Sequence, residues 1–294
     1  MTGMKTSLEK YLKDELTDRA LVFEPGQGEV LSIKGGRITF KVTSEHSKDH
    51  VAGSLEQHDD WFYEFNFSNG AKTVTRNDLV RTIHESKPEL IFPFLDHLLE
   101  RRWPEIDCLD MACHQGWYSI QTALRGARKV FGVDVREEHV ARAELVRDLA
   151  GLTNASFEQR NLYDLSPETD GRYDLTLCLG LLYHLADPVG ALKIARAMTK
   201  ELCVIETQVA RPADDLEYLW GSDVDPRHGH AVAVGKVGPR HVAGGTDLVL
   251  VPTLRARYYM LHAVGFERLY LSIPPASSYD QFRDLDRVVI FASG

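Results

Sequence analysis

The stretch that decides the fold is CLDMACHQGWYS, at residues 108–119. It starts as an apolar strand, passes the acidic residue Asp110 and a tight turn, and enters an apolar helical pattern after Gly116. A second apolar strand, predicted over 129–133, is followed at once by Asp134. This order is typical of a Rossmann-like nucleotide site, where an acid after the second strand accepts hydrogen bonds from ribose hydroxyls.

The composition of the turn indicates which nucleotide it holds. A dinucleotide requires the pattern G-x-G-x-x-G, because glycines allow the pyrophosphate and the helix to approach the backbone. Ala112, His114 and Trp117 occupy those positions here, so NAD and FAD fit poorly. S-adenosylmethionine carries no phosphate, and its methionine part tolerates Ala112 and His114. We therefore predict S-adenosylmethionine as the cofactor.

Strand and helix patterns alternate on both sides of the turn. Apolar strands are predicted over 106–111, 129–133, 156–159, 175–179 and 202–205, with helices over 117–124, 136–150 and 188–198. A helix over 254–264 is followed by strands over 267–272 and 287–292 with no helix between them. The chain is thus predicted to be an α/β protein with a doubly wound, Rossmann-like, mostly parallel sheet and a C-terminal antiparallel strand pair.

The N-terminal part of the chain has a different pattern. Residues 1–86 are predicted to form an accessory region, with a polar helix over 8–16, β-hairpins around 35–36 and 68–70, and a polar loop over 44–60. Pro88 is predicted to open a helix through Leu99, since proline is favoured at the first helical position. Residues 87–294 are predicted to form the main domain. Its insertion at about 208–250 has little periodicity and is predicted to be a lid over the crevice.

Bulk composition limits the function further. Thirty-four basic and 43 acidic residues give a net charge of −9, which argues against a nucleic-acid substrate, because phosphate binding normally requires a basic face. No apolar run approaches the roughly 20 residues that span a bilayer, and the N-terminus has no signal-peptide pattern, so a cytoplasmic protein is expected. The four cysteines are predicted to be small buried hydrophobic residues. No pattern in the sequence predicts the oligomeric state.

Over 88–294 the chain resembles the class I S-adenosylmethionine-dependent methyltransferases. The resemblance implies that the acidic strand end and the turn hold the methionine part, that Asp134 holds the ribose, and that two residues after the third strand of this domain lie at the adenine edge. The cofactor-binding residues so implied are Asp110, Ala112, Cys113, Gly116, Asp134, Asn161 and Leu162. Leu179, at the end of the fourth strand, completes this predicted set.

The segment LCLGLLYHLADP, residues 177–188, resembles the Gly-Val-Leu-Tyr-His segment of the tRNA wobble-uridine carboxymethyltransferases. In that family an arginine matching Arg287 and a tyrosine matching Tyr183 read the carboxylate of a carboxylated cofactor. The net charge is wrong for tRNA, and the N-terminal region does not reproduce that family's substrate arm. We therefore predict a methyltransferase that acts on a small molecule with the ordinary cofactor. The alternatives are a tRNA-modifying carboxymethyltransferase and a non-catalytic cofactor-binding partner subunit.

The residues after the fourth strand are candidates for the reacting centre. His184 is predicted to be a general base or to orient the acceptor, and Tyr183 to orient the acceptor or face the sulfonium. The alternative is that His184 caps the next helix and Tyr183 packs in the core.

Four residues are predicted to bind substrate: Trp61, Tyr63, Arg287 and His228. The aromatic cluster that contains Trp61 and Tyr63 is either an active-site flap or, more simply, the hydrophobic face of a hairpin. His228 and His230 with nearby aspartates resemble a metal site only weakly, and no metal is predicted.

Overall fold

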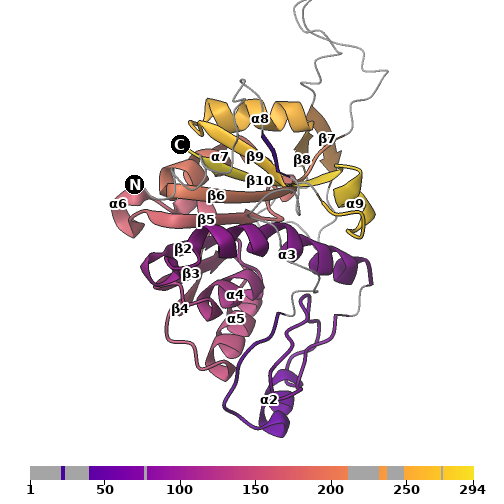
Figure 1. The fold of residues 1–294 in the computed structure, drawn as a ribbon, viewed down its shortest axis with the longest axis vertical. Coiled ribbons are helices and arrows are strands. Elements are labelled where there is room, and N and C mark those ends of the chain that lie inside the picture. The colour runs from indigo at the N-terminus through magenta and orange to yellow at the C-terminus, as the bar shows by residue number, and fades with distance from the viewer. Residues whose placement is uncertain (1–20, 24–39, 76–77, 211–231, 237–247, 273) are drawn as a thin grey trace, which may run out of the picture.

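A computed structural model describes residues 21–23, 40–75, 78–210, 232–236, 248–272 and 274–294 (Figure 1). An eight-stranded sheet in the order β1-β9-β10-β6-β5-β2-β3-β4 forms its centre. The strands are β1 (Leu21–Phe23), β2 (Asp107–Met111), β3 (Lys129–Asp134), β4 (Ala155–Gln159), β5 (Tyr173–Leu179), β6 (Thr199–Gln208), β9 (Arg268–Ser272) and β10 (Arg287–Ser293).

The sheet is mostly parallel, and the antiparallel strand lies at the C-terminal end of the chain, as predicted. Strands β4, β3, β2, β5 and β6 pair in parallel, whereas β10 runs antiparallel to both β6 and β9. In the β9–β10 pair, Leu271 lies opposite Ile290. The predicted doubly wound sheet with a C-terminal antiparallel strand pair is therefore confirmed.

Helices cover both faces of the sheet (Figure 1). One face carries α3 (Asp78–Leu99), α4 (Trp117–Leu124) and α5 (Glu137–Leu149), and the other carries α7 (Pro188–Met198) and α8 (Leu254–Ala263). Because successive strand residues point to opposite faces, Cys108 packs in the α3–α5 core and Leu109 in the α7–α8 core. Both side chains are completely buried, as expected for a strand in a sheet that helices cover on both faces.

The strand order reverses between β2 and β5, where a ligand crevice is expected. From β2 the chain proceeds outward to β3 and β4, and from β5 it proceeds in the opposite direction to β6. In open α/β sheets, ligands bind outside the carboxyl ends of the strands where the order reverses. Asp110 and Leu179, near the ends of β2 and β5, therefore flank the expected ligand position.

Helix α2 (Lys48–Leu55) lies where a polar loop was predicted, so that prediction was wrong. Ser47 caps the helix by accepting a hydrogen bond from the His50 amide at 3.2 Å. Val51 and Leu55 lie one helical turn apart and are both buried. This narrow apolar stripe is enough to stabilise the helix when it packs on a neighbouring segment. The stripe is too short to be recognised among polar residues.

The hairpin predicted around 68–70 is present as a tight antiparallel turn. The Phe67 amide donates to the Ala71 carbonyl at 2.9 Å, and the Thr73 amide donates to the Phe65 carbonyl at 3.1 Å. The helix predicted over 8–16 and the hairpin at 35–36 lie outside the described residues.

Helix α3 begins at Asp78, so the prediction that Pro88 opens it was wrong. Pro88 and Pro93 both lie inside the helix. An interior proline costs about 3 kcal/mol because it removes a hydrogen bond and crowds the preceding turn. Burial of the residues that follow, such as Ile91 and Leu95, offsets that cost. The helix therefore continues across position 86/87, the predicted boundary of the accessory region.

Two short strands lie within the segment predicted to lack periodic structure. β7 (Val232–Lys236) and β8 (Leu248–Pro252) pair antiparallel. Beyond β8, Thr253 bridges in parallel to Ala210, just after the end of β6. The prediction of an irregular segment throughout 208–250 was therefore wrong at these strands.

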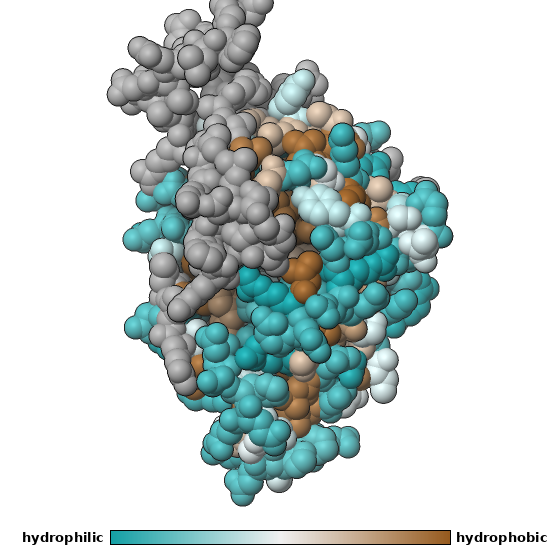
Figure 2. Space-filling model, turned by 180° about the vertical axis from the view of Figure 1, so that it is seen from behind, coloured by the Kyte–Doolittle hydropathy of each residue, from teal (hydrophilic) through white to brown (hydrophobic). Residues whose placement is uncertain are grey.

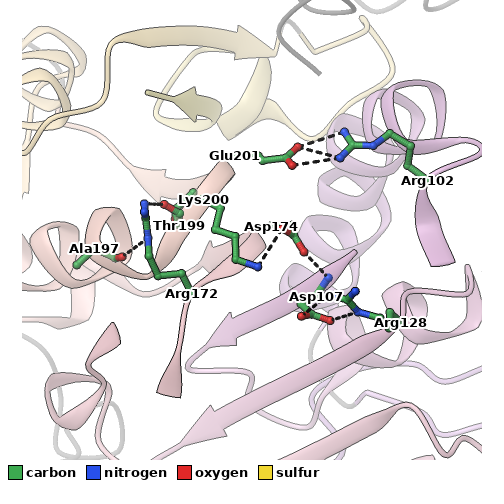
Figure 3. Close-up of polar contacts among 9 residues, drawn as sticks. All are labelled: Arg102, Asp107, Arg128, Arg172, Asp174, Ala197, Thr199, Lys200 and Glu201. Carbon is green, nitrogen blue, oxygen red and sulfur yellow. Dashed lines mark hydrogen bonds and ion pairs between the residues drawn. The ribbon is translucent and has the colours of Figure 1, made fainter. Parts of the chain in front are cut away.

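A polar network ties together the amino-terminal ends of the central strands, at the edge opposite the crevice (Figure 3). Asp174 on β5 accepts a hydrogen bond from the Asp107 amide at 2.9 Å and pairs with Lys200 on β6 at 3.1 Å. Arg128 makes two hydrogen bonds to the Asp107 carboxylate, at 2.8 and 2.6 Å. This network fixes β2, β5 and β6 relative to one another.

The face seen from behind is mainly hydrophilic, with hydrophobic side chains visible only in separate patches (Figure 2). Among the described helices, none combines the length and apolar character needed to cross a bilayer.

Candidate functional site

The turn after β2 adopts a backbone conformation that side chains rarely tolerate. Ala112, His114 and Gly116 have positive φ angles of 60°, 52° and 75°. A Cβ atom on Gly116 would lie 2.7 Å from the Cβ of Ala143 on α5, so only glycine fits there. The turn thus keeps left-handed geometry at two non-glycine positions and brings α4 close to α5.

Asp134 at the end of β3 holds this turn in place. Its carboxylate accepts hydrogen bonds from the backbone amides of His114 at 2.9 Å and Arg136 at 3.0 Å. The Nδ1 atom of His139 lies 3.3 Å from the same carboxylate. Two carboxylate oxygens offer about four lone-pair positions, so these contacts leave capacity for a further donor.

Asp110 is the second acidic residue of the site and is almost completely buried. Ser119 on α4 donates a hydrogen bond to it at 2.6 Å. Burial raises the pKa of Asp110 to about 7, although the Ser119 bond opposes that shift. Its carboxyl group is therefore poised to ionise when a cation, such as an ammonium group, binds beside it.

The N-terminal aromatic segment lies against this turn. The Gln115 side-chain oxygen accepts hydrogen bonds from the amides of Phe62 at 2.9 Å and Tyr63 at 3.3 Å. The rings of Phe62, His114 and His139 form a stack, with successive centroid distances of 4.5 and 3.6 Å. Burial lowers the pKa of His114 well below its usual value, so this stacked ring is neutral at pH 7.

A buried charged cluster lies beyond the end of β5. Arg287 on β10 donates from Nη1 to Glu206 on β6 at 2.6 Å and to the Tyr183 hydroxyl at 3.1 Å. Lys87 on α3 pairs with the other Glu206 oxygen at 2.7 Å. We call Lys87, Tyr183, Glu206 and Arg287 the charged cluster. A Cβ atom on Gly180 would lie 3.4–3.5 Å from Lys87, Tyr183 and Glu206, so Gly180 lies directly against the charged cluster.

The charged cluster carries one more positive than negative charge. Burial alone would raise the pKa of Glu206, but Lys87 and Arg287 outweigh it and hold that pKa below its usual value. Burial lowers the pKa of Lys87, and the carboxylate of Glu206 opposes this shift. Two buried cations that share one carboxylate provide an electropositive wall beside the crevice.

Three more side chains, Tyr63, His84 and Tyr118, complete the wall on the α3 side. Burial is the main cause that raises the pKa of Tyr63, and the negative charges of Asp110 and Glu206 add to it. His84 stacks on Tyr63 with ring centroids 4.2 Å apart. The Tyr118 hydroxyl and His84 Nδ1 have no hydrogen-bond partner among the described residues. Unsatisfied buried polar atoms of this kind are expected where a ligand binds.

The structure thus brings together most of the predicted site. Asp110 and Asp134 lie beside the turn, Tyr63 packs against the turn, and Tyr183 and Arg287 meet beyond the end of β5. Cys113 is buried, and its sulfur would lie 3.0 Å from a Cβ atom on Gly132, so it packs the turn against β3.

Other predicted residues have structural contacts or lie elsewhere. The Asn161 side chain caps the short 3-10 helix η2 (Leu162–Asp164) by accepting from the Tyr163 amide at 3.1 Å. Leu162 and Leu179 are buried apolar residues. Trp61 contacts α2, since its indole donates to the Leu55 carbonyl at 3.3 Å.

His184 lies in the 3-10 helix η3 (Leu182–His184), with its ring 4.3 Å from that of Tyr183. It is not the cap of α7, because Asp187 holds that position. His228 lies outside the described residues. No group of three potential metal ligands occurs within the parts of the chain that the structure describes.

Sequence reasoning assigned no site role to four residues: His84, Lys87, Tyr118 and Glu206. Lys87 and His84 were missed because α3 was predicted to start after them. Glu206 offered one signal, a carboxylate inside an otherwise apolar strand, which is costly unless it is paired.

Part of the chain is similar in sequence to known methyltransferases. Residues 104–219 match the family described as "Methyltransferase domain". A ubiquinone biosynthesis O-methyltransferase of Acinetobacter baylyi is 29% identical over 92 residues, which are 31% of this chain and 38% of that protein. A tRNA U34 carboxymethyltransferase of Campylobacter hominis is 32% identical over 93 residues, 29% of each chain. The chain thus spans well under half the length of these curated relatives.

The fold extends further than the sequence match. The crystal structure of the N-terminal domain of EvdMO1 with SAH bound superimposes with a TM-score of 0.63 at 20% identity, covering 85% of this chain and 98% of that one. Magnesium protoporphyrin IX methyltransferase from Synechocystis, with bound SAH, gives a TM-score of 0.50 at 16% identity, covering 75% and 89% of the two chains. Residues 104–219 are therefore similar to a methyltransferase domain, and the fold is shared with solved structures of S-adenosylmethionine-dependent methyltransferases.

Proposed function

We propose that this chain transfers a methyl group from S-adenosylmethionine to a small-molecule acceptor by in-line displacement. One observation carries the proposal: Asp110 and Asp134, on adjacent parallel strands, flank a left-handed turn in which any side chain on Gly116 would clash. A carboxylate on each side of such a turn suits a ligand that has an ammonium group at one end and a ribose diol at the other.

The residues divide into two roles in this proposal. Asp110 and the turn hold the methionine part, Asp134 holds the ribose, and Asn161, Leu162 and Leu179 border the adenine. The crevice wall formed by Tyr63, Tyr183 and the charged cluster then faces the acceptor. The enzyme's main contribution is to hold the nucleophile and the methyl group near 3 Å and collinear.

The net charge of the chain and the burial of the charged cluster favour a small-molecule acceptor over tRNA. The chain carries a net charge of −9, and the cations of the charged cluster are buried instead of displayed on a surface. Buried cations recognise a group that enters the crevice, whereas tRNA binding requires an exposed basic face. The O-methyltransferase names among the relatives support the same class of acceptor.

Carboxymethyl transfer, including transfer to tRNA, is a second candidate because of one specific contact. Arg287 and Tyr183 meet at 3.1 Å, and the charged cluster has one positive charge in excess. That arrangement could receive a cofactor carboxylate, as the similarity to the tRNA carboxymethyltransferase suggests. The third possibility, a cofactor-binding subunit without activity, is disfavoured by the presence of both acids and of the charged cluster.

Calorimetry tests the cofactor. The protein should bind S-adenosylmethionine and SAH, its demethylated product, with measurable heat, and NAD should give none. Heat of binding from NAD, with none from SAH, would overturn the proposal. A parallel titration with the carboxylated cofactor distinguishes the two transfer reactions, because the ordinary enzyme should prefer the cofactor without the carboxylate.

Transfer from methyl-labelled cofactor to a metabolite pool then tests the activity. Label that enters small molecules supports the main proposal, label that enters only tRNA supports the second candidate, and binding without transfer supports the third. The role of His184 is tested in the same assay. If His184 is the general base, His184→Ala should lower the rate about 100-fold or more, whereas a change within a few-fold would remove that role.

A further inference from the structure

Arg257 on α8 is a completely buried arginine that pairs with no carboxylate in the part of the chain that the structure describes. Its relative exposure is 0%, and none of its three side-chain nitrogens has a hydrogen-bond partner among the described residues. Its backbone amide is part of the helix and donates to the Thr253 carbonyl at 2.9 Å. The charged cluster, with Lys87 and Arg287 both paired to Glu206, shows that this fold pairs its other buried cations near the crevice.

An unpaired buried guanidinium is unfavourable for a folded protein. Charges are normally buried only when they are paired, because the loss of hydration is costly. Burial lowers the pKa of Arg257 to about 10, so it still carries a proton at pH 7. Apolar residues of α8 such as Leu254 and Leu261 belong to the surrounding core, where leucine would satisfy packing alone. Folding stability alone therefore does not explain why this position is an arginine.

The location of Arg257 connects it to the crevice. α8 starts directly beyond the carboxyl end of β6, where the Ala210 amide donates to the Pro252 carbonyl at 3.1 Å. Cys178, the residue before the end of β5, belongs to the same buried core as Leu261, which lies one helical turn after Arg257 on α8. Arg257 thus lies on the α7–α8 side of the β5 and β6 ends, while Lys87 and Arg287 lie on the α3 side.

We propose that Arg257 binds an anionic group, a carboxylate or a phosphate, of the acceptor. Such a group would accept two parallel hydrogen bonds from the guanidinium, the geometry in which arginine binds both ions best. The N-terminal end of α8 adds a favourable dipole for an anion. Because the guanidinium is fully covered, the ligand reaches it when the surrounding chain opens locally. The identity of the ligand as the acceptor rests on the proposed function, but anion binding itself does not.

The test measures anion binding without any cofactor present. Wild type, Arg257→Leu and Arg257→Lys are titrated with inorganic phosphate and, separately, with benzoate, at constant ionic strength set by chloride. Binding is followed by calorimetry and by the melting temperature, and Arg283→Leu, on the exposed side of α9 (Asp280–Arg283), serves as the matched control. The two anions distinguish a phosphate group from a carboxylate group.

Wild type and Arg283→Leu should bind one of the two anions and melt at a higher temperature in its presence. Arg257→Leu should bind it about 30-fold more weakly or worse and lose the shift, yet melt above wild type in chloride alone, because a buried unpaired charge is gone. Arg257→Lys, which keeps the charge, should retain part of the binding. Wild type that responds to neither anion, or Arg257→Leu that responds as strongly as wild type, would overturn the inference. Failure of SAH to bind would instead overturn the proposed function and leave this result intact.

Discussion

Arg287 donates a hydrogen bond from Nη1 to the Tyr183 hydroxyl at 3.1 Å, although 104 residues separate them in the chain. The contact exists because β10 lies antiparallel beside β6, with Arg287 opposite Gln208, so the first residue of β10 reaches the carboxyl end of β5. A residue near the C-terminus therefore completes the wall of the crevice.

Removal of the Tyr183 hydroxyl should affect transfer more than cofactor binding. Tyr183→Phe keeps the ring but leaves Arg287 without this acceptor, so the wall loses its fixed orientation. We expect the rate of transfer to fall about tenfold or more, with SAH affinity within a few-fold of wild type. Tyr173→Phe, a buried tyrosine at the amino-terminal start of β5, is the control and should leave the rate unchanged. Equal rates for wild type and Tyr183→Phe would contradict this role.

Asp134 should determine cofactor affinity. Asp134→Asn removes the charge that accepts hydrogen bonds from the His114 and Arg136 amides and, in our proposal, from the ribose. Charge-assisted hydrogen bonds of this kind contribute about 1.5–3 kcal/mol, so calorimetry should show SAH affinity weakened by about 10- to 100-fold. Glu138→Gln, at an exposed position on the neighbouring α5, should bind SAH like wild type. Unchanged affinity in Asp134→Asn would refute the assignment of Asp134 to the cofactor.

The turn after β2 should not tolerate a side chain at Gly116. Gly116→Ala combines a positive φ of 75° with a contact of 2.7 Å to the Ala143 Cβ, and we expect a loss of about 2–5 kcal/mol in the free energy of unfolding. Gly126→Ala is a matched control, since its φ is also positive at 89° but its Cβ would meet nothing within 4 Å. Gly126→Ala should lower the free energy of unfolding by about 1–2 kcal/mol, which is the cost of the left-handed backbone conformation alone. Similar losses in urea melts of both variants would show that the close approach of α5 is unimportant.

Asp110 should make stability depend on pH in a defined window. Burial raises its pKa from 3.8 to about 7, so between these values the folded state binds the proton more tightly than the unfolded state. The stability of wild type relative to Asp110→Asn should therefore fall as pH rises from about 4 to about 7, by up to about 4 kcal/mol. Urea melts of both proteins across this window measure the difference. A difference that stays constant with pH would mean that Asp110 ionises normally.

The same ionisation should appear in cofactor binding. In our proposal the ammonium group of the cofactor lies beside Asp110 and favours its ionised form. SAH affinity should therefore increase as pH rises toward and through 7 in wild type and should vary less in Asp110→Asn.

The polar network at the opposite edge should affect stability but not the site. Asp174→Ala leaves the Asp107 amide and Lys200 without their shared partner, and we expect a loss of about 1–3 kcal/mol in the free energy of unfolding. Asp148→Ala, which removes an exposed ion pair with Arg147, should cost at most about 1 kcal/mol. SAH affinity should be the same in both variants and wild type. A cofactor-affinity loss in Asp174→Ala would show that the two edges of the sheet are coupled.

Local sequence patterns predicted much of the fold. The bounds predicted for the helices over 117–124 and 188–198 agree with α4 and α7, and the alternation of elements predicted the parallel sheet with its antiparallel end. These features depend on periodicity and on residues at the ends of elements, which neighbouring positions encode. The start of α3 was missed because two prolines interrupt its pattern, and burial of its apolar face, a tertiary effect, keeps it helical.

By itself the sequence determined the turn after β2, with Asp110, Gly116 and Asp134 at spacings that a strand, a turn and a helix require. Only the tertiary structure decided that Lys87 and Arg287 share Glu206, and that Arg257 is buried with no acceptor among the described residues. The physical reason is that ion pairing and desolvation depend on distances between segments far apart in the chain. Strand order and helix packing set those distances, and no local pattern records them.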